Sequence, residues 1–200
     1  MKHENLDLIK EIDSLWDPVY PYLARHIQEL YGRHDGNVLE IGPFCGVIFT
    51  LLRKKIGNSF LIATFPPGMG DFFREESRNR KVEDKIEIIE TDPNLTGVEE
   101  NKIDLALFRG AFFFPSLFEV NVSAIYQVLR KNGMAFIGGG FGKFTPNKII
   151  KEIGTRSRYL NLRIGKIEVN EDQLRQSMKK NMEGKVEIIT EGGLWVLMKK

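Results

Sequence analysis

Apolar residues along the chain fall into short blocks that alternate between two patterns. The nearly continuous apolar runs are typical of buried strands: Val38–Ile41, Phe60–Thr64, Ile86–Glu90, Ile103–Phe108 and Met134–Ile137. The blocks between them have the apolar spacing of amphipathic helices: Val47–Ile56, Asp71–Val82 and Val122–Arg130, the last with Asn132-Gly133 as its expected C-terminal cap. Strands that alternate with helices predict a parallel sheet with helices on both faces.

The two ends of the chain differ from this pattern. Residues 7–31 have helical spacing that is interrupted at Pro18 and Pro21, so we expect two short helices that meet at a proline break. Residues 185–190 and 194–198 are strand-like and joined by a Gly-Gly turn, which predicts a hairpin and an antiparallel strand. The alternating strands and helices, together with the two chain ends, predict an α/β fold with a mostly parallel seven-stranded sheet and a C-terminal antiparallel hairpin.

Composition narrows the class of protein. The 200 residues fit a single domain, 1–200, with 42% hydrophobic and 28% charged residues and a formal net charge of +2. So small a charge disfavours nucleic-acid and membrane partners. One cysteine excludes an internal disulfide, and the charged N-terminus has no apolar stretch of signal-peptide length. We therefore expect a cytoplasmic protein.

The stretch from Val38 to Gly46 carries the most chemical information. An apolar run ends at Glu40, and Gly42 and Gly46 enclose a turn that leads into a helix. Glycines at such a turn allow positive φ and close approach of a ligand to the backbone, while the helix start offers free N–H donors. Glu40 disfavours a phosphate and favours a ligand with a positive charge or donor groups. An ordinary strand-to-helix turn without a ligand is the alternative.

This stretch resembles motif I of the class I S-adenosylmethionine-dependent methyltransferases, an acidic residue followed by G-x-G-x-G with Phe44 in place of the middle glycine. Three later segments are similar to the family's strand 3, strand 4 and pre-strand 5 motifs: Ile86–Asp92, Lys102–Gly110 and Ile125–Met134. The resemblance covers nearly the whole chain. It implies the family's fold and S-adenosylmethionine as cofactor.

The resemblance also implies a cofactor site at the carboxyl ends of the first four strands. Its expected residues are Glu40, Gly42, Pro43, Phe44, Gly46, Thr64, Phe65, Thr91, Asp92, Arg109 and Gly110. Glu40 and Gly42 would face the methionine part, and Asp92 would accept a hydrogen bond from the adenine amino group.

Two departures from the family pattern matter. The acidic residue that usually holds both ribose hydroxyls at the end of strand 2 is absent, and Thr64-Phe65 stands there instead. If the hydroxyls lie there unpaired, an acid at position 65 would strengthen cofactor binding. Phe44 must point away from the ligand or pack against it. These departures motivate the alternative of a catalytically silent binding or regulatory protein with the methyltransferase fold.

Catalytic candidates are few. Arg109 follows a buried strand and could bind a substrate carboxylate or phosphate, or else pair with Asp92. Tyr20 and Tyr22 lie in the expected N-terminal helical lid, residues 1–34, and either cover the site or only pack the helix. If the methyl acceptor needs a base, Tyr20, Tyr22 and Asp92 are the candidates. The histidines are not at metal-ligand spacing, so we expect no metal.

The substrate side is expected after strands 4 and 5. A glycine cluster at residues 138–142 is either a substrate loop or a tight exit from the sheet. We interpret the three aromatic residues after strand 4, Phe112, Phe113 and Phe114, as core residues with a partly exposed wall rather than as a substrate box. Residues 141–184 form a possible substrate-side insertion, in which the basic residues of 155–166 are either a solvated helix face or a pocket wall. The D/N-P-P-Y/F motif of nucleic-acid methyltransferases is absent, so we expect a small-molecule substrate.

Overall fold

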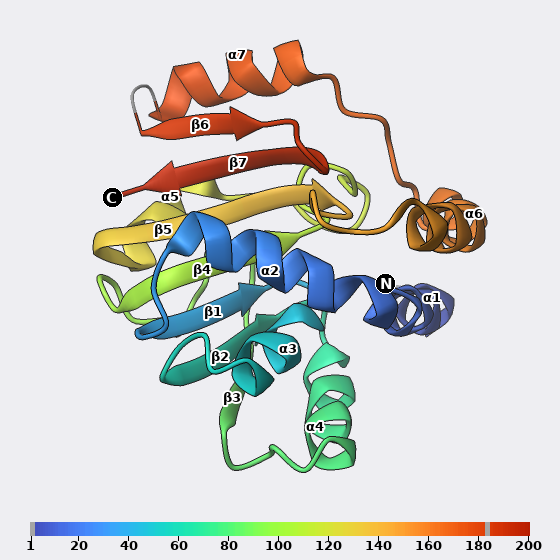
Figure 1. Cartoon of the computed structure of the whole chain (residues 1–200), viewed down its shortest axis with the longest axis horizontal. Helices are drawn as coiled ribbons and strands as arrows, with labels where there is room; N and C mark the ends of the chain where they lie inside the picture. The colour runs from blue at the N-terminus through green and yellow to red at the C-terminus, as the bar shows by residue number, and fades with distance from the viewer. Residues whose placement is uncertain (1–2, 183–184) are drawn as a thin grey trace.

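A twisted seven-stranded sheet forms the centre of the molecule in the computed structural model, which describes residues 3–182 and 185–200 (Figure 1). Its strands are β1 Asn37–Ile41, β2 Ser59–Thr64, β3 Ile86–Glu90, β4 Ile103–Arg109, β5 Leu129–Gly140, β6 Val186–Ile189 and β7 Gly193–Lys199. They lie in the order β3-β2-β1-β4-β5-β7-β6. Strands β1 to β5 are mutually parallel, and β7 is antiparallel to both β5 and β6. The predicted α/β architecture with a C-terminal hairpin is confirmed.

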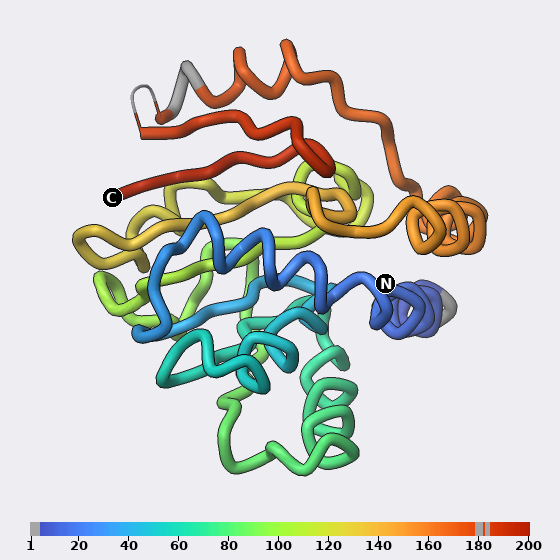
Figure 2. The backbone as a smooth tube through the Cα atoms, viewed as in Figure 1, coloured from blue at the N-terminus to red at the C-terminus, as the bar shows by residue number. Residues whose placement is uncertain are grey.

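Helices cover both faces and the carboxyl edge of this sheet. They are α1 His3–Leu15, the 3-10 turn η1 Asp17–Val19, α2 Tyr20–Tyr31, α3 Val47–Arg53, α4 Met69–Asn79, α5 Val122–Val128, α6 Asn147–Arg163 and α7 Glu171–Met182. In Figure 1, α2 and α3 lie in front of the sheet and α5 behind it, while α7 lies alongside β6. The arrows of β1, β4 and β5 point toward α1 and α6, which pack together beyond the strand ends. The tube in Figure 2 shows the same arrangement, in which the first helix and residues 147–163 lie side by side.

Burial explains which strands are central. Every residue of β4 is buried, and so are the last four residues of β1. Strand β3, at one edge, has only Ile86 buried, and its two glutamates, Glu87 and Glu90, are exposed. A strand that is covered by helices on both faces reads as a continuous apolar run, which is why β1 and β4 are clear in the sequence.

The expected helix cap at Asn132-Gly133 is wrong. Helix α5 ends at Val128, because Leu129 is already extended and pairs with Ile103 of β4. The β4–β5 register then shifts between Ile103 and Leu105, so Asn132 and Gly133 form an irregularity inside β5 rather than a helix end. Asn132 has a φ of 65°, and its N–H donates to the carbonyl of Lys200. Asn and Gly tolerate left-handed backbone in a bulge as well as in a cap, so the sequence signal was the same for both.

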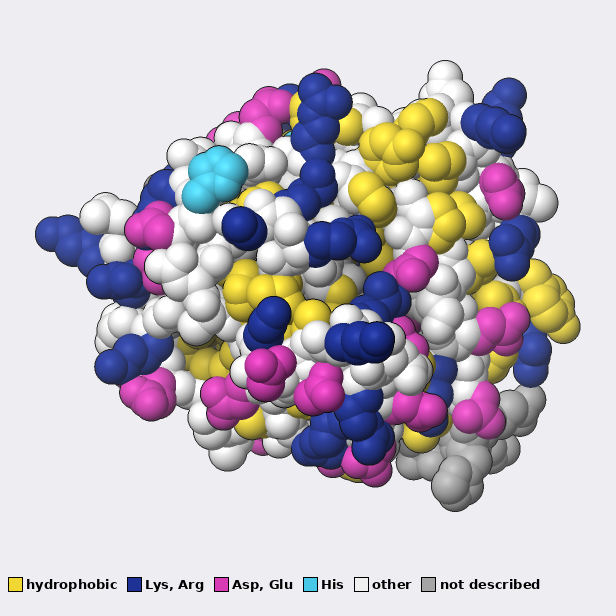
Figure 3. Space-filling model, turned by 60° about the horizontal axis from the view of Figure 1, so that its bottom comes forward, with side chains coloured by type: hydrophobic (Ala, Val, Ile, Leu, Met, Phe, Trp, Pro, Cys, Tyr) yellow, Lys and Arg dark blue, Asp and Glu magenta, His cyan; other side chains and the backbone are white. Residues whose placement is uncertain are grey.

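The described surface shows no single dominant charge on the face drawn in Figure 3. Lysine and arginine side chains alternate there with aspartate and glutamate. Among residues 3–182 and 185–200, the structure contains no helix that is both long and apolar enough to cross a membrane.

Candidate functional site

The strand order reverses between β1 and β4. From this point the chain runs outward to β2 and β3 on one side and to β5 on the other. In open parallel sheets, ligands collect outside the carboxyl ends of the strands at such a switch point. Gly42 follows the end of β1, and Gly110 follows the end of β4. What occupies the space above these two glycines decides which ligand the site can take.

Gly42 is approached by a side chain of this protein. It has a φ of +92°, and a Cβ placed on it would lie 2.6 Å from Cε2 of Phe108. Its carbonyl accepts hydrogen bonds from the Thr64 hydroxyl at 2.9 Å and from the Cys45 thiol at 3.0 Å. Glycine is required here for both the left-handed backbone and the contact with Phe108. The Phe108 ring therefore lies on the side of Gly42 where a Cβ would stand, and the approach of a ligand to the Gly42 backbone stays a prediction.

Phe44 occupies the space between the ends of β1 and β4. Its side chain is only 1% exposed, and its ring centroid lies 5.2 Å from that of Phe114. Gly110 has a φ of +83°, and a Cβ there would lie 2.7 Å from Cδ2 of Phe44. The residue that replaces the family's middle glycine thus stands at the switch point itself, packed against the backbone after β4.

A second group of aromatic rings closes the end of β2. Phe65 is 5% exposed and packs edge-on against Phe108 and Phe118, with ring centroids 5.8 Å and 5.6 Å away. Thr64 uses its hydroxyl on Gly42. Neither residue presents an unpaired polar group to the position where the family holds a ribose.

The polar residues at the end of β3 bind their own loops. Glu90 accepts hydrogen bonds from the N–H groups of Gly68 and Gly70, at 2.9 and 3.0 Å, and so holds the start of α4. Asp92 accepts from the Asn94 N–H at 2.8 Å and from the Thr96 hydroxyl at 3.0 Å. The Thr91 hydroxyl donates to the Thr96 carbonyl. Asp92 therefore caps a turn here, and its role toward adenine stays a prediction.

Arg109 is buried and tied to the N-terminal helix α1. One of its Nη2 hydrogen bonds goes to Asp13 Oδ1 at 2.6 Å and another to the Tyr20 hydroxyl at 2.6 Å. The Tyr20 hydroxyl also lies 2.6 Å from Asp13 Oδ1. The alternative that Arg109 pairs with Asp92 is wrong, because its partner is Asp13, ninety-six positions away in sequence. The Nε of Arg109 is buried and has no hydrogen-bond partner among the described residues.

This cluster makes Tyr20 a poor base. Burial first, and then the nearby Asp13 carboxylate, raises the pKa of the Tyr20 hydroxyl well above its usual value, although Arg109 acts in the opposite direction. A hydroxyl that is hydrogen-bonded on both sides and protonated at neutral pH is structural. Tyr22 is half-buried and does not line the cavity described below. Of the two tyrosines, only Tyr20 packs against the motif turn, where a Cβ on Gly46 would collide with its ring.

Glu40 lies within β1 and has no exposed surface. Its Oε2 accepts a hydrogen bond of 2.7 Å from the Ile48 N–H at the start of α3, and its Oε1 has no partner among the described residues. Burial raises the pKa of Glu40 to about 8, although the Ile48 N–H and Arg109 favour its charged form. The carboxyl is therefore mostly neutral at pH 7.

Glu40 should make folding sensitive to pH in a defined window. Its pKa is raised in the folded state, from 4.5 to about 8, so the favourable contribution is complete below pH 4.5 and is lost as the pH rises through 8. Glu40→Gln keeps an acceptor for the Ile48 N–H and removes the titration. We expect the free energy of unfolding of Glu40→Gln to rise relative to wild type between pH 5 and pH 8, as measured by urea unfolding. Glu87→Gln, on the exposed side of β3, should run parallel to wild type; a parallel course for Glu40→Gln would contradict the burial argument.

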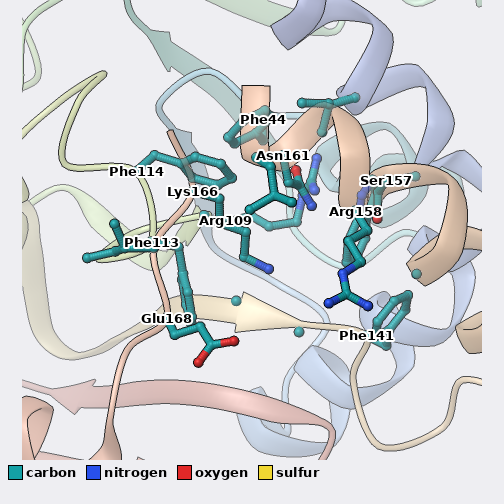
Figure 4. Close-up of a pocket in the computed structure, with 18 residues that line it drawn as sticks. Phe44, Arg109, Phe113, Phe114, Phe141, Ser157, Arg158, Asn161, Lys166 and Glu168 are labelled. Atoms are coloured by element: carbon teal, nitrogen blue, oxygen red, sulfur yellow. The ribbon is translucent and has the colours of Figure 1, made fainter. Parts of the chain in front are cut away.

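A cavity of about 390 Å³ lies beyond Phe44, over the carboxyl ends of β4 and β5 (Figure 4). Its walls come from α1, α6, the loop after β4, the end of β5 and the loop after α6. The volume is within the range of small-molecule sites. Aromatic rings form much of the lining, namely Trp16, Phe44, Phe113, Phe114 and Phe141. The polar side chains of the lining are Arg109, Ser157, Arg158, Asn161, Lys166 and Glu168.

The cavity brings together three segments that the sequence left ambiguous. Gly139 and Gly140 of the glycine cluster, Phe113 and Phe114 after β4, and Arg158 and Lys166 all line it. Trp16 and Phe141 were not singled out, and the centroids of their rings stack 4.7 Å apart at its wall. Two of the expected cofactor residues beside Phe44, namely Arg109 and Gly110, also line it, whereas Gly42, Thr64, Phe65 and Asp92 do not.

Comparison with known proteins defines the fold. No family model matches the chain, and no curated protein matches it in sequence. A proposed S-adenosyl-L-methionine-dependent methyltransferase from Methanococcus maripaludis superposes with a TM-score of 0.80 and 23% identity, over 100% of this chain and 95% of that one. A SAM-dependent methyltransferase from Aquifex aeolicus gives 0.63 and 14%, over 96% of both chains. Geranyl diphosphate C-methyltransferase from Streptomyces coelicolor A3(2) gives 0.56 and 12%, over 88% and 76%. The chain has the fold of the class I S-adenosylmethionine-dependent methyltransferases, as the resemblance implied.

The switch point fits the cofactor of that fold in part. At the methionine end, Glu40 offers an unpartnered oxygen and Gly42 the expected positive φ. At the ribose end Phe65 replaces an acid, and Phe44 and Phe108 fill the space over both glycines. The packed rings of Phe44 and Phe108 therefore line the switch point where the fold would place S-adenosylmethionine.

Proposed function

We propose that this protein transfers a methyl group from S-adenosylmethionine to a small molecule that binds in the cavity over β4 and β5. The observation that carries the proposal is the position of the cavity, which is lined by Phe44 and Gly110 at the strand ends where ligands of this fold collect. The whole-chain likeness to proteins described as methyltransferases supports the same reaction class. The cytoplasm is the location we expect.

The chain's own residues would act mainly by position. S-adenosylmethionine, when bound, supplies an electrophilic methyl group, so holding the acceptor in line accounts for much of the rate enhancement. The aromatic lining would exclude water and hold the acceptor's apolar part. Asp13 and Tyr20 hold Arg109 at the floor of the cavity, so Arg109 acts as a positioning residue between α1 and β4.

A second candidate is a methyltransferase fold that binds a small molecule in the cavity and carries out no methyl transfer. The specific observation in its favour is the burial of Phe44 over Gly110, together with Phe65 in place of the ribose-binding acid. Both candidates use the same cavity. They differ only in whether the donor reaches it.

Phe44→Ala separates the two candidates. The substitution removes the ring from the switch point, so S-adenosylhomocysteine should bind to the variant at least tenfold more tightly than to wild type, as measured by calorimetry. Phe73→Ala is the matched control, because it also removes a buried phenylalanine but lies on α4, away from the switch point. Each change costs about 3 to 5 kcal/mol of stability, so the titrations are run well below the melting temperature.

The three outcomes have different meanings. Binding to wild type, with NAD and ATP as negative controls, supports methyl transfer and means that Phe44 does not exclude the donor. Binding to Phe44→Ala alone supports the silent candidate. Binding to neither protein, with Phe44→Ala folded by circular dichroism, rejects the donor and with it the methyl-transfer proposal.

A further inference from the structure

We propose that the cavity binds a small molecule with a flat apolar body and a single anionic group, carboxylate or phosphate, and that Lys166 and Arg158 bind the anion. The proposal rests on the proposed function only in taking this cavity as the acceptor site. It needs no donor.

Lys166 brings a positive charge into the cavity. It follows α6, and its ammonium end is directed toward the middle of the cavity (Figure 4). Its Nζ lies 5.5 Å from the centroid of the Phe113 ring. Burial against the cavity wall lowers the pKa of Lys166, although the residue as a whole is exposed, and Glu168 offsets this shift in part. Within the described part of the chain, this ammonium makes no hydrogen bond and no ion pair within 4 Å.

Arg158 brings a second positive charge from α6. Its guanidinium points into the same space as Lys166 and the Glu168 carboxylate (Figure 4). No described residue forms a hydrogen bond or ion pair with this side chain. Since Arg109 is already paired with Asp13, the lining holds two cations against one carboxylate. One negative charge on the ligand would balance the cavity.

The buried groups without partners at the cavity are also donors. Trp16 Nε1 and Arg109 Nε are both buried and lack an acceptor among the described residues, and both residues line the cavity. A buried donor without a partner is costly, and a ligand with acceptor oxygens would relieve that cost once a small shift of either side chain brought its N–H to the cavity surface. Unpaired donors on the floor and cations at the mouth favour an anion over a cation or a neutral ligand.

The apolar walls define the rest of the ligand. Trp16 stacks on Phe141 on one side, and Phe44 lies against Phe114 on another. Flat aromatic walls favour a planar body, because rings pack by offset stacking or edge-on. Leu162 and Ile167 at the mouth are 64% and 46% exposed, and a bound apolar body would cover part of them.

Probes of similar shape and different charge test the ligand class in the full chain without any donor. Phenylacetate and phenyl phosphate carry the anion, and phenylacetamide is the neutral counterpart of the first. Calorimetry gives the affinities, and the Trp16 indole N–H resonance, assigned with Trp16→Phe, reports the site. We expect millimolar binding of both anions, at least tenfold tighter than that of phenylacetamide at low ionic strength.

Three substitutions should change phenylacetate binding in a defined direction. Lys166→Met and Arg158→Gln should each weaken phenylacetate binding about tenfold and leave phenylacetamide unchanged. Glu168→Gln should tighten phenylacetate binding, because it removes the opposing charge. Lys148→Met and Arg156→Gln are matched controls on α6 that do not line the cavity, and neither should alter binding.

Equal affinity for phenylacetate and phenylacetamide overturns the proposal, and so does unchanged binding in both Lys166→Met and Arg158→Gln. At about pH 5, below the second pKa of a phosphate ester at about 6, phenyl phosphate and phenylacetate each carry close to one negative charge. Tighter binding of phenyl phosphate under these conditions identifies the anion as a phosphate, and the reverse identifies a carboxylate. Failure here with S-adenosylhomocysteine binding intact rejects the ligand class and leaves methyl transfer standing. Anion binding without S-adenosylhomocysteine binding supports the ligand class and rejects methyl transfer.

Discussion

Asp13→Ala should lower the free energy of unfolding by about 3 to 5 kcal/mol, because it leaves the Arg109 guanidinium buried without its counter-charge. Arg109 is 6% exposed and Asp13 is 4% exposed, so water cannot replace the lost partner. Tyr20 would keep one hydrogen bond to Arg109 but offers no charge. For a chain of this length, each kcal/mol shifts the melting temperature by about 2 to 4 °C. Thermal unfolding should therefore show a loss of roughly 6 to 20 °C.

Asp71→Ala provides the matched control. Asp71 forms an ion pair of the same type with Arg74, at 2.8 Å, but its side chain is 86% exposed. Exposed pairs contribute little, so the melting temperature should change by no more than about 2 to 3 °C. Equal effects of the two substitutions would mean that the Asp13–Arg109 pair does not hold α1 onto the sheet.

The order of elements was readable from the sequence because it depends on local patterns. Continuous apolar runs identified β1 and β4, which are buried on both faces, and the Gly-Gly turn identified the hairpin of β6 and β7. The prolines at positions 18 and 21 predicted the break between α1 and α2, which the structure has at η1. These signals lie within a few residues of the feature that they specify.

The contents of the site were not readable, because they depend on residues far apart in sequence. The partner of Arg109 comes from α1, and no local rule selects Asp13 over Asp92. Gly42 was correctly expected to have positive φ, yet the sequence could not reveal that the Phe108 ring packs beside it. From the sequence, Lys166 and Arg158 were either part of a solvated helix face or part of a pocket wall. Only the packing of α6 beside α1 places them at the cavity.

Phe65→Asp should abolish cooperative folding at pH 7 or come close to it. The sequence alone suggested that an acid at this position would strengthen cofactor binding. The structure instead places Phe65, 5% exposed, between the rings of Phe108 and Phe118. Loss of the ring costs about 3 to 5 kcal/mol, and an unpaired carboxylate in its place adds several more. Together they approach the total stability of a typical domain, about 5 to 15 kcal/mol.

Two further variants at position 65 separate the lost ring from the buried charge. Phe65→Leu keeps an apolar side chain and should cost only about 1 to 2 kcal/mol. Phe65→Asn has the shape of the aspartate without its charge, so it should be more stable than Phe65→Asp at pH 7. Burial would raise the pKa of an aspartate here above its unfolded value, so the stability gap between these two variants should narrow as the pH falls toward 4. Urea unfolding from pH 4 to pH 7 measures that gap; a Phe65→Asp protein as stable as Phe65→Leu at pH 7 would show that the end of β2 is open to solvent and would restore it as a place for ribose hydroxyls.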